Sequence, residues 1–580
     1  MPRLCYYSQG EFCTDIAPNG EDPMTRQIPG LRSSISTIAI LASLAMSSPS
    51  LAQPQTPSVL TGKIISAEEG AMEGVLVSAK RAGSTITVSV VSDAKGQYSF
   101  PQGRLEPGKY SVWIRAIGYE LPNAAPAQID ITQRQAASLD LNLVKTRDLE
   151  HQLSSGEWLQ SIPGTKQFKE ALFNCTSCHT LARPLQSKYN AADMGKVVQR
   201  MSTWAQGSMP TQPQPQLGRK IGPPTAGQAA LGKFISTINL SEGPERPYPL
   251  KTDPRPKGKA TRVIITEYDL PRPLAMPHDA QLDARGFVWY GDFGAQVLGR
   301  LDPKTGKAVE YAIPETKPGA PTGSLNIEQD KSGAIWIGQM MQGSLVKFDP
   351  KTEKFQSWGS PTFLKRDEAR IAMVTPTGTH LDGKVWIGGD SEYQVDLKTG
   401  QWTTIDYRKG QPAGAKDHGS YGVAADSQNN FYGMELNGDN IIKVDAKTLV
   451  PTYYPTPTAN SGPRRGHFDN QDRLWFAENR GQNIAMFDAK TGKITEWKVP
   501  TPYSTPYDAI FDGNAHAWTG GMANDHVSRL NTKTGEVVDY LLPSETNIRR
   551  VDVDKSVAPS QLWVGNNHKA QLVRVEPLDP

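Results

Sequence analysis

Residues 474–500 read LWFAENRGQNIAMFDAKTGKITEWKVP, a stretch of short strand-like runs separated by turns. An apolar-aromatic run precedes a run that ends in an Asp turn, then Thr-Gly, then an acidic-aromatic run that ends in Pro. The pattern recurs, and its successive aromatic anchors are 47, 50, 45, 44, 43 and 45 residues apart. The anchors are Trp289, Trp336, Trp386, Phe431, Trp475, Trp518 and Trp563. A period near 45 residues of short strands is typical of a β-propeller, and the Gly and β-branched content excludes helical repeats.

The outermost strand of each repeat predicts how the blades close into a ring. Residues 310–314, 496–500 and 539–543 read EYAIP, EWKVP and DYLLP, but no such run follows the seventh anchor. The missing copy, EYDLP, precedes the first anchor at residues 267–271. Pairing this run with the last blade would remove an open sheet edge. We therefore expect residues 262–580 to form a seven-bladed β-propeller closed by its N-terminal strand.

The phrase LWFAEN at residues 474–479, with its Thr-Gly-Lys turn and Glu-Trp strand, resembles the virginiamycin B lyase, or streptogramin lyase, family. The resemblance covers residues 262–580 and is more specific for the fold than for the reaction, because function depends on the site. It implies a reaction that opens a cyclic depsipeptide by elimination, with a divalent cation, a histidine and an acid. The acid would hold the metal while the histidine moves a proton at neutral pH.

The catalytic residues that this resemblance implies are scattered over the blades. In the family the acid follows the histidine by fourteen residues, and His278 and Asp292 match that spacing in the first blade. The fifth blade retains the acid as Glu478 but has Arg464 at the histidine position. His278, Asp292 and Glu478 are therefore the candidate catalytic residues, with a divalent cation in the propeller as their candidate cofactor.

A second interpretation of these residues is a propeller mouth that binds a polar organic molecule or a metal. In the third, purely structural interpretation, several of them only satisfy loop carbonyls. The mouth residues are His278, Asp292, Tyr421, Arg464, Glu478, Tyr507 and Arg549.

Residues 175–179 read CTSCH, the C-x-x-C-H pattern that attaches a c-type haem. Cys175 and Cys178 would form thioether bonds to the haem vinyl groups, and His179 would give an imidazole nitrogen to the iron. Half a zinc site and a redox dithiol are the alternatives. Zinc normally needs a second Cys/His pair, and the other cysteines, Cys5 and Cys13, precede a predicted cleavage site. We therefore expect a covalently bound haem c.

Residues 148–242, around this motif, resemble a class I cytochrome c domain. Helices are expected over residues 168–174, 192–204 and 227–238, where apolar residues recur at helical spacing. The last helix of such a domain packs against the first.

The second iron ligand must be a soft or imidazole donor, and Met194, Met201 and Met209 are the local choices. Met201 lies on the apolar face of its expected helix, which favours a core role. The family's ligand commonly sits in a Met-Pro step, which implies Met209 before Pro210. His/Met ligation raises the haem potential and favours electron transfer over oxygen chemistry.

Residues 58–145 are expected to form a small β-sandwich. Strand-like runs at 75–77, 86–91, 98–100 and 110–114 alternate with Asp- and Gly-containing turns. GVLV at residues 74–77 and GKYSV at 108–112 resemble the carboxypeptidase regulatory-like family, which implies a transthyretin-like fold and no catalysis. A stabilising or spacing module is the simpler interpretation, and weak glycan contact is the alternative.

The ends of these domains carry targeting and linker signals. Residues 1–52 read as a signal peptide, because basic residues precede a short apolar run at 35–46 and small residues follow it. The true start is then either Met1 or Met24. Residues 243–261 are proline-rich and basic, which predicts an extended, semi-rigid linker.

Charge and hydropathy exclude some functions. The net charge of +3 over 580 residues is too small to indicate a nucleic-acid partner. A transmembrane anchor needs roughly 20 apolar residues, and the run at 35–46 is shorter. We therefore expect no membrane span. The signal peptide and the haem motif, which is matured outside the cytoplasm, predict a periplasmic protein.

Three functions follow from these patterns. The first is an electron-transfer protein whose propeller binds a small organic substrate or a periplasmic redox partner protein. The second is a metal-dependent C–O lyase with the haem as a separate electron carrier or sensor. The third is a non-catalytic periplasmic binding scaffold. If the chain is an enzyme, a haem-dependent oxidoreductase component is favoured over a streptogramin-type lyase.

Overall fold

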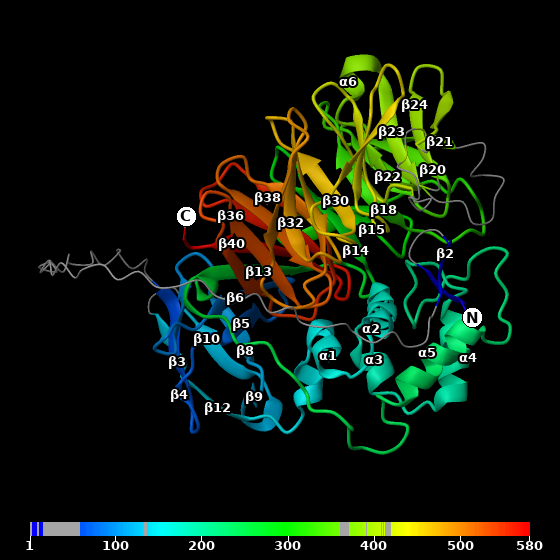
Figure 1. The fold of residues 1–580 in the computed structure, drawn as a ribbon. Helices are drawn as coiled ribbons and strands as arrows, with labels where there is room; N and C mark the ends of the chain where they lie inside the picture. Colours follow the sequence, from blue (N-terminus) through cyan, green and yellow to red (C-terminus); the bar gives the residue numbers. More distant parts are fainter. Residues whose placement is uncertain are drawn as a thin grey trace, which may run out of the picture.

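Antiparallel sheets of four strands form the C-terminal part of the chain (Figure 1). The computed structural model describes residues 3–7, 11–15, 58–132, 136–359, 371–389, 391–407, 409, 411 and 419–579. The first three sheets contain β14 (Pro277–Leu282), β15 (Val288–Asp292), β16 (Val297–Asp302), β17 (Lys307–Ala312); β18 (Ser324–Gln329), β19 (Ile335–Gln339), β20 (Ser344–Asp349), β21 (Lys354–Gly359); and β22 (Ile371–Thr375), β23 (Lys384–Gly389), β24 (Glu392–Asp396), β25 (Trp402–Ile405), with helix α6 (Thr379–Asp382) before β23.

The next four sheets repeat this order. They contain β26 (Gly422–Ala425), β27 (Phe431–Met434), β28 (Asn440–Val444), β29 (Pro451–Pro455); β30 (Pro463–Phe468), β31 (Arg473–Glu478), β32 (Asn483–Asp488), β33 (Ile494–Lys498); β34 (Pro506–Phe511), β35 (His516–Gly521), β36 (His526–Asn531), β37 (Val537–Leu541); and β38 (Ile548–Asp554), β39 (Gln561–Asn566), β40 (Gln571–Pro577) with β13 (Val263–Asp269). Every aromatic anchor lies on the second strand of its sheet and is at most 2% exposed.

The Asp turns before the anchors explain why the repeat needs both residue types. The indole of Trp289 donates to Asp283 Oδ2 at 3.1 Å, and the indole of Trp475 donates to Asp469 Oδ2 at 3.0 Å. Asp283 also accepts the backbone N–H of Phe287 at 3.1 Å, which closes the turn between β14 and β15. One carboxylate therefore fixes the turn and satisfies the buried indole donor.

Inner strands link the sheets in sequence. Each of β14, β18, β22, β26, β30 and β34 contacts the next, and β38 of the last sheet contacts both β34 and β14. β13 pairs with β40 along its whole length, from Val263 opposite Pro577 to Asp269 opposite Gln571. The expected pairing of the run before the first anchor with the last sheet is therefore present.

The N-terminal β-sandwich adds strands to this last sheet. Its strands are β3 (Ser58–Ser66), β4 (Gly70–Ala71), β5 (Leu76–Arg81), β6 (Ile86–Val91), β7 (Gln97–Pro101), β8 (Gly108–Arg115), β9 (Tyr119–Glu120), β10 (Ala127–Ile131), β11 (Ala137–Ser138) and β12 (Leu141–Lys145), with the short helix η1 (Pro122–Ala124). The four strand-like runs of the sequence lie on β5, β6, β7 and β8 or at their edges. β6 pairs with the free edge of β13, so one sheet runs through both domains in the order β10-β8-β5-β6-β13-β40-β39-β38. The sequence does not indicate this pairing, which covers a sheet edge.

A helical segment lies beneath the sheets, between them and the linker (Figure 1). It contains η2 (Leu149–Gln152), α1 (Ser155–Ser161), α2 (Lys166–Phe173), η3 (Asn174–Ser177), α3 (Ala182–Leu185), α4 (Ala191–Met201) and α5 (Ala226–Ser236). The three expected helices correspond to α2, α4 and α5. Phe168 of α2 stacks on Phe234 of α5 at 4.5 Å, so the last helix does pack against the one that leads into the C-x-x-C-H motif. A Cβ on Gly232 would lie 2.4 Å from the backbone N of Gly195, which explains how closely α4 and α5 approach.

The proline-rich segment and the chain start complete the fold. Before η4 (Gly258–Thr261), the segment has no strand among its described residues, and Arg246 pairs with Glu150 at 2.5 Å. Strands β1 (Arg3–Tyr7) and β2 (Glu11–Asp15) pair with each other. Apart from these two strands, the expected signal peptide at 1–52 and the alternative start at Met24 lie outside the described residues.

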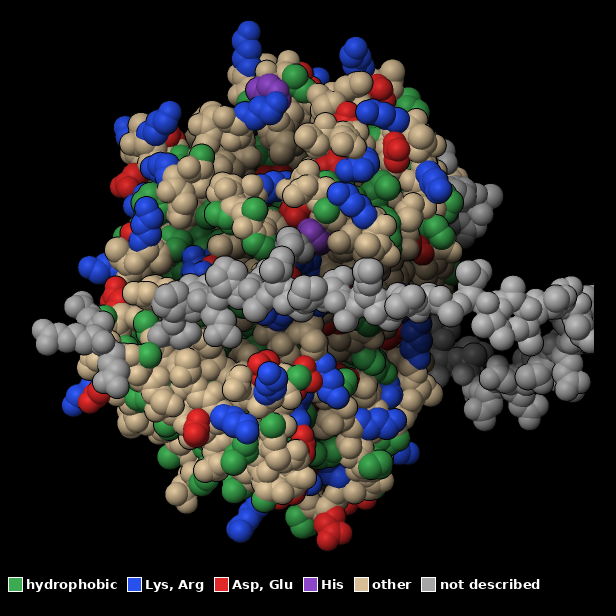
Figure 2. Space-filling view, turned by 90° about the vertical axis from the view of Figure 1, so that its left-hand side faces the viewer, with side chains coloured by type: hydrophobic (Ala, Val, Ile, Leu, Met, Phe, Trp, Pro, Cys, Tyr) green, Lys and Arg blue, Asp and Glu red, His purple; other side chains and the backbone are tan. Residues whose placement is uncertain are grey.

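The surface charges and the helix lengths can be compared with the small net charge and the expected lack of a membrane span. On the face shown in Figure 2, Lys and Arg side chains are interspersed with Asp and Glu. No helix among the described residues is long and apolar enough to cross a membrane.

Candidate functional site

A cavity of about 1000 Å³ lies in the helical segment, against the C-x-x-C-H motif. Cys175, Cys178 and His179 all line it. The opposite walls come from α4, α5 and the loop that follows α4 as far as Pro210. These walls include Val198, Met201, Trp204, Ala205, Gln206, Pro210, Gln228 and Leu231. The motif and mainly apolar side chains therefore line one cavity.

The two motif cysteines are free thiols. Helix η3 continues α2 and turns the peptide so that the backbone N–H of Cys178 donates to the carbonyl of Cys175 at 3.4 Å. Burial raises the pKa of Cys175 to about 12 and that of Cys178 to about 11. Reactive redox cysteines have lowered pKa values, so this environment does not favour the redox-dithiol alternative.

The His179 ring is oriented as a ligand would be. Its Nδ1 donates to the carbonyl of Thr180 at 2.8 Å, so the lone pair is on Nε2. Burial lowers the pKa of the ring, which favours the neutral form. A backbone carbonyl that holds the second ring nitrogen is the usual outer partner of a metal-bound histidine.

The three candidate methionines occupy different surroundings. Met194 is 2% exposed in the core of the helical segment. Met201 lines the cavity, although the sequence favoured a core role for it. Met209 is half-buried and packs against side chains of the sheets, while its neighbour Pro210 lines the cavity.

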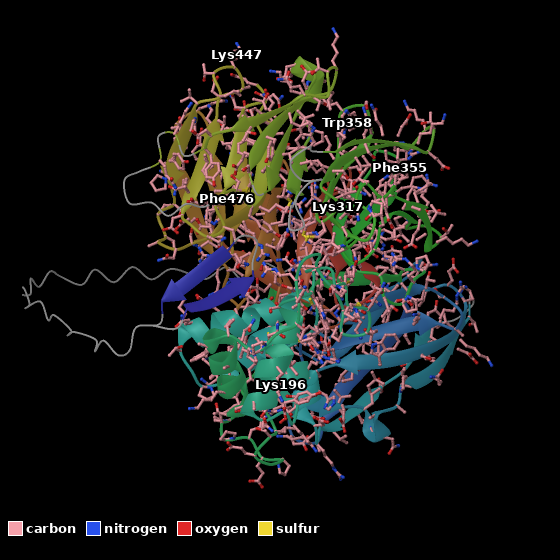
Figure 3. The ribbon with its side chains drawn as sticks, turned by 90° about the vertical axis from the view of Figure 1, so that its right-hand side faces the viewer. Lys196, Lys317, Phe355, Trp358, Lys447 and Phe476 are labelled. Carbon is pink, nitrogen blue, oxygen red and sulfur yellow. The ribbon has the colours of Figure 1, made fainter. Side chains whose placement is uncertain are left out.

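The helical segment packs against the sheets, and α4 with its Lys196 lies below them in the view of Figure 3. Gly207 lies so close to β15 that a Cβ would be 1.9 Å from the carbonyl O of Phe293. Gln214 donates to the carbonyl of Gly294 at 2.9 Å and accepts from the backbone N–H of Thr322 at 2.8 Å. Methionines of the sheets share one apolar cluster with Ala205 and Met209 of the helical segment, and such flexible side chains suit irregular packing. They are Met276, Met340, Met341, Met373 and Met522, with Met209 from the helical side.

Five of the expected mouth residues contact one another in the sheets. They are His278, Tyr421, Arg464, Tyr507 and Arg549. The Tyr421 hydroxyl bonds to the Tyr507 hydroxyl, and the Tyr507 hydroxyl donates to His278 Nε2 at 3.1 Å. The Arg464 guanidinium lies 4.2 Å from the centre of the Tyr507 ring, and that of Arg549 lies 5.5 Å from it.

The mouth differs from the expectation in one respect. A mouth that binds a molecule needs accessible side chains, but His278 and Tyr507 have no exposed surface. Burial lowers the pKa of His278 to about 4. Its Nδ1 donates to Asp279 Oδ1 at 2.7 Å, so both ring nitrogens are hydrogen-bonded inside the protein.

Asp292 and Glu478 serve their own sheets. Asp292 accepts from Arg272 at 2.5 Å and from the backbone N–H of Gly294 at 2.8 Å. Glu478 accepts from the side-chain amide of Asn483 at 2.7 Å. Among the described residues, no hydrogen bond or ion pair joins either acid to His278, and no three His, Cys, Asp or Glu side chains form a group able to hold a metal ion. The donor set therefore does not fit the divalent cation implied by the lyase resemblance.

Glu478 nevertheless has a raised pKa. Burial raises its pKa from the ordinary 4.5 to about 8, and one carboxylate oxygen has no partner among the described residues. Between these two values the folded chain holds a proton that the unfolded chain releases, so stability falls as pH rises through this window. Glu478→Gln is expected to remove that decline in stability. The measurement is the midpoint of urea unfolding at about pH 5 and about pH 8. An equal decline in the variant and the unsubstituted chain would contradict the assignment.

Sequence reasoning missed the partners of the mouth residues. Asp279 contacts His278 and Arg465, and His568 contacts the C-x-x-C-H peptide. Arg465 donates to both carboxylate oxygens of Asp279, at 2.9 and 2.8 Å. The signal was the pair of charged residues at 278–279 and again at 464–465, because adjacent residues on an inner strand reach different neighbours.

A second cavity, of about 1030 Å³, lies where the β-sandwich, the helical segment and the last two sheets meet. Its lining includes Trp113 of β8, Glu157 of α1, Asp253, His526 and Lys569. Weak glycan contact by the β-sandwich stays a prediction.

Comparisons with known proteins agree with the two β regions. The carboxypeptidase regulatory-like domain matches residues 59–144, and the virginiamycin B lyase family matches residues 409–578. No curated protein matches the chain.

Solved structures with similar folds include a streptogramin B lyase, 20% identical, with a TM-score of 0.46 over 55% of this chain and 100% of that chain. A virginiamycin B lyase from Staphylococcus aureus is 18% identical, with a TM-score of 0.46 over 54% of this chain and 99% of that chain. The β-propeller domain of Cps50 from Myceliophteria thermophila is 9% identical, with a TM-score of 0.43 over 53% and 99%. The chain is thus a mainly β, multidomain protein that combines a carboxypeptidase regulatory-like domain with a region like the virginiamycin B lyase family.

Proposed function

We propose that the chain is a periplasmic c-type cytochrome whose haem domain sits on the mouth of a closed, seven-bladed, lyase-like β-propeller. Its function is haem binding and electron transfer, and its propeller binds a small organic substrate or a periplasmic redox partner protein. The observation that carries this proposal is the convergence of Cys175, Cys178 and His179 on one cavity.

The residues present fit haem c. Cys175 and Cys178 would hold the group through thioether bonds, and His179 Nε2 would bind its iron. The Thr180 carbonyl orients the imidazole, and Val198 and Leu231 exclude water from the wall of the cavity. When bound, the group supplies one-electron chemistry, while the protein sets its orientation and electrostatics.

The buried mouth supports electron transfer over lyase chemistry. A general base must lie within hydrogen-bond reach of the proton it takes, and His278 is fully buried with both ring nitrogens bonded inside the protein. Pairing of β13 with β40 and contact of β38 with β14 support the closed ring. The apolar run at 35–46 supports export.

The test is expression with its own signal in a bacterium that matures c-type cytochromes. We expect a red periplasmic protein with a reduced-minus-oxidised c-type spectrum, and a haem-stained band on a denaturing gel. A haem-stained band absent from the periplasmic fraction would contradict the proposal.

Met209 is our proposed second iron ligand, with Met201 on the cavity wall as its competitor. Met209→Ala is expected to remove the methionine-to-iron charge-transfer band, because the thioether donor is lost. Met201→Ala is the matched control and should keep the band. Loss of the band in Met201→Ala alone would assign the iron to Met201 instead.

A metal-dependent lyase is the second candidate, favoured by the family match over residues 409–578. Incubation with a streptogramin and Mg²⁺ tests it directly. Ring opening that is lost in His278→Ala would establish the lyase, and an unchanged streptogramin would exclude this substrate. If neither activity is found and a partner complex is, a binding scaffold is the function.

A further inference from the structure

Two side chains of the last sheet hold the C-x-x-C-H peptide itself. His568, in the turn after β39, donates from Nε2 to the carbonyl of Thr176 at 2.8 Å. Arg549, on β38, donates from Nη2 to the carbonyl of Ser177 at 3.4 Å. Thr176 and Ser177 are the two residues between the cysteines, so the propeller region binds the backbone of the motif at both of its variable positions.

Arg549 brings a buried positive charge to this peptide. The side chain is 3% exposed, and its Nε donates to Asn547 Oδ1 at 2.6 Å. The guanidinium lies 5.1 Å from the centre of the Phe293 ring. Among the described residues no carboxylate forms an ion pair with Arg549, so its charge is not neutralised locally.

A second buried cation, Arg464, lies on the same ring as Arg549. Arg464 stacks on Tyr507, the same ring that Arg549 faces, and it also forms no ion pair with a described carboxylate. Buried charges act over longer distances than exposed ones because the interior screens them weakly. Arg549 and Arg464 therefore bring two cations, neither paired with a described carboxylate, to the Tyr507 ring, and Arg549 also reaches the motif peptide.

We propose that Arg549 and His568 are positioning residues of the haem site, supplied by the propeller: Arg549 raises the reduction potential, and His568 fixes the motif peptide. The inference rests on the proposed function. Reduction adds one electron to the haem, and a nearby uncompensated positive charge stabilises the more negative, reduced state. A protein sets the reduction potential of a haem partly through burial and through hydrogen bonds around the ligands.

The charge is tested by the midpoint potential of the full chain, titrated spectroscopically with redox mediators. Arg549→Met is expected to lower the equilibrium constant for reduction about ten-fold, as loss of one nearby, weakly screened charge implies. Arg549→Lys should keep most of the potential. Arg300→Met is the matched control, because Arg300 is a propeller cation stacked 5.5 Å from the Trp289 ring on β15, away from the motif. Equal potentials in Arg549→Met and Arg300→Met would overturn the charge effect.

The peptide contact is tested by hydrogen exchange, measured on the full chain as purified, with or without haem. His568→Leu is expected to speed exchange of the amides at 174–180 several-fold, and His568→Gln, which keeps a donor, should not. Equal exchange in these two variants would overturn the role of His568. A colourless chain would refute the proposed function and the effect on potential, while faster exchange in His568→Leu would still support the contact.

Discussion

Replacing Arg465 by Leu is expected to lower the free energy of unfolding of the propeller region by about 3–5 kcal/mol. Arg465 of β30 binds Asp279 of β14 through two hydrogen bonds, and the two side chains are 3% and 1% exposed. The strands belong to the fifth and first sheets, which are not neighbours in the order of the inner strands, so the pair spans the centre. The loss leaves a buried carboxylate whose remaining partners are Arg550 at 3.7 Å, the His278 ring and the backbone N–H of Ile327.

Urea unfolding followed by tryptophan fluorescence measures this effect. Arg285→Leu is the matched control, because it removes an Arg–Asp pair whose arginine is 53% exposed, and should cost about 1 kcal/mol or less. Adding Asp279→Asn to Arg465→Leu should recover part of the loss, since the uncompensated charge is gone. If Arg465→Leu lowers the free energy of unfolding no more than the control does, the Arg465–Asp279 pair does not stabilise the propeller region.

The double variant Cys175→Ser, Cys178→Ser is expected to carry no covalent haem. A serine hydroxyl cannot form the thioether bond, and both thiols line the cavity that would hold the group. Haem per chain is measured by pyridine haemochrome absorbance and by haem staining after a denaturing gel.

Ser177→Ala is the control for that experiment. It changes the same peptide by one oxygen atom and keeps the carbonyl that binds Arg549. It should retain haem at the level of the unsubstituted chain. Haem that stays on the double variant through the denaturing gel would contradict attachment at this motif.

The repeat was predictable because every blade buries an aromatic anchor at a similar spacing. In three blades the anchor is a Trp whose indole donates to the turn Asp six residues earlier, as Trp289 does to Asp283, and this spacing is visible in the sequence. The pairing of β13 was predictable because a missing outer strand leaves an edge. The helices around the motif were predictable from their apolar spacing.

Contacts between domains were not predictable, because no periodic pattern encodes them. The pairing of β6 with β13 depends on two strand edges meeting in space. The cover over the propeller mouth depends on the close approach of Gly207 to Phe293. For this reason the sequence indicated five residues that meet at the mouth, but it did not indicate the separate contacts of Asp292 and Glu478 or the contacts of Arg549 and His568.

The most direct test of the account is the intact mass of the mature protein, purified from the periplasm under denaturing conditions. The account predicts the mass of the polypeptide plus one haem, with the added mass on the peptide that contains residues 175–179. A mature chain with the mass of the bare polypeptide would contradict it.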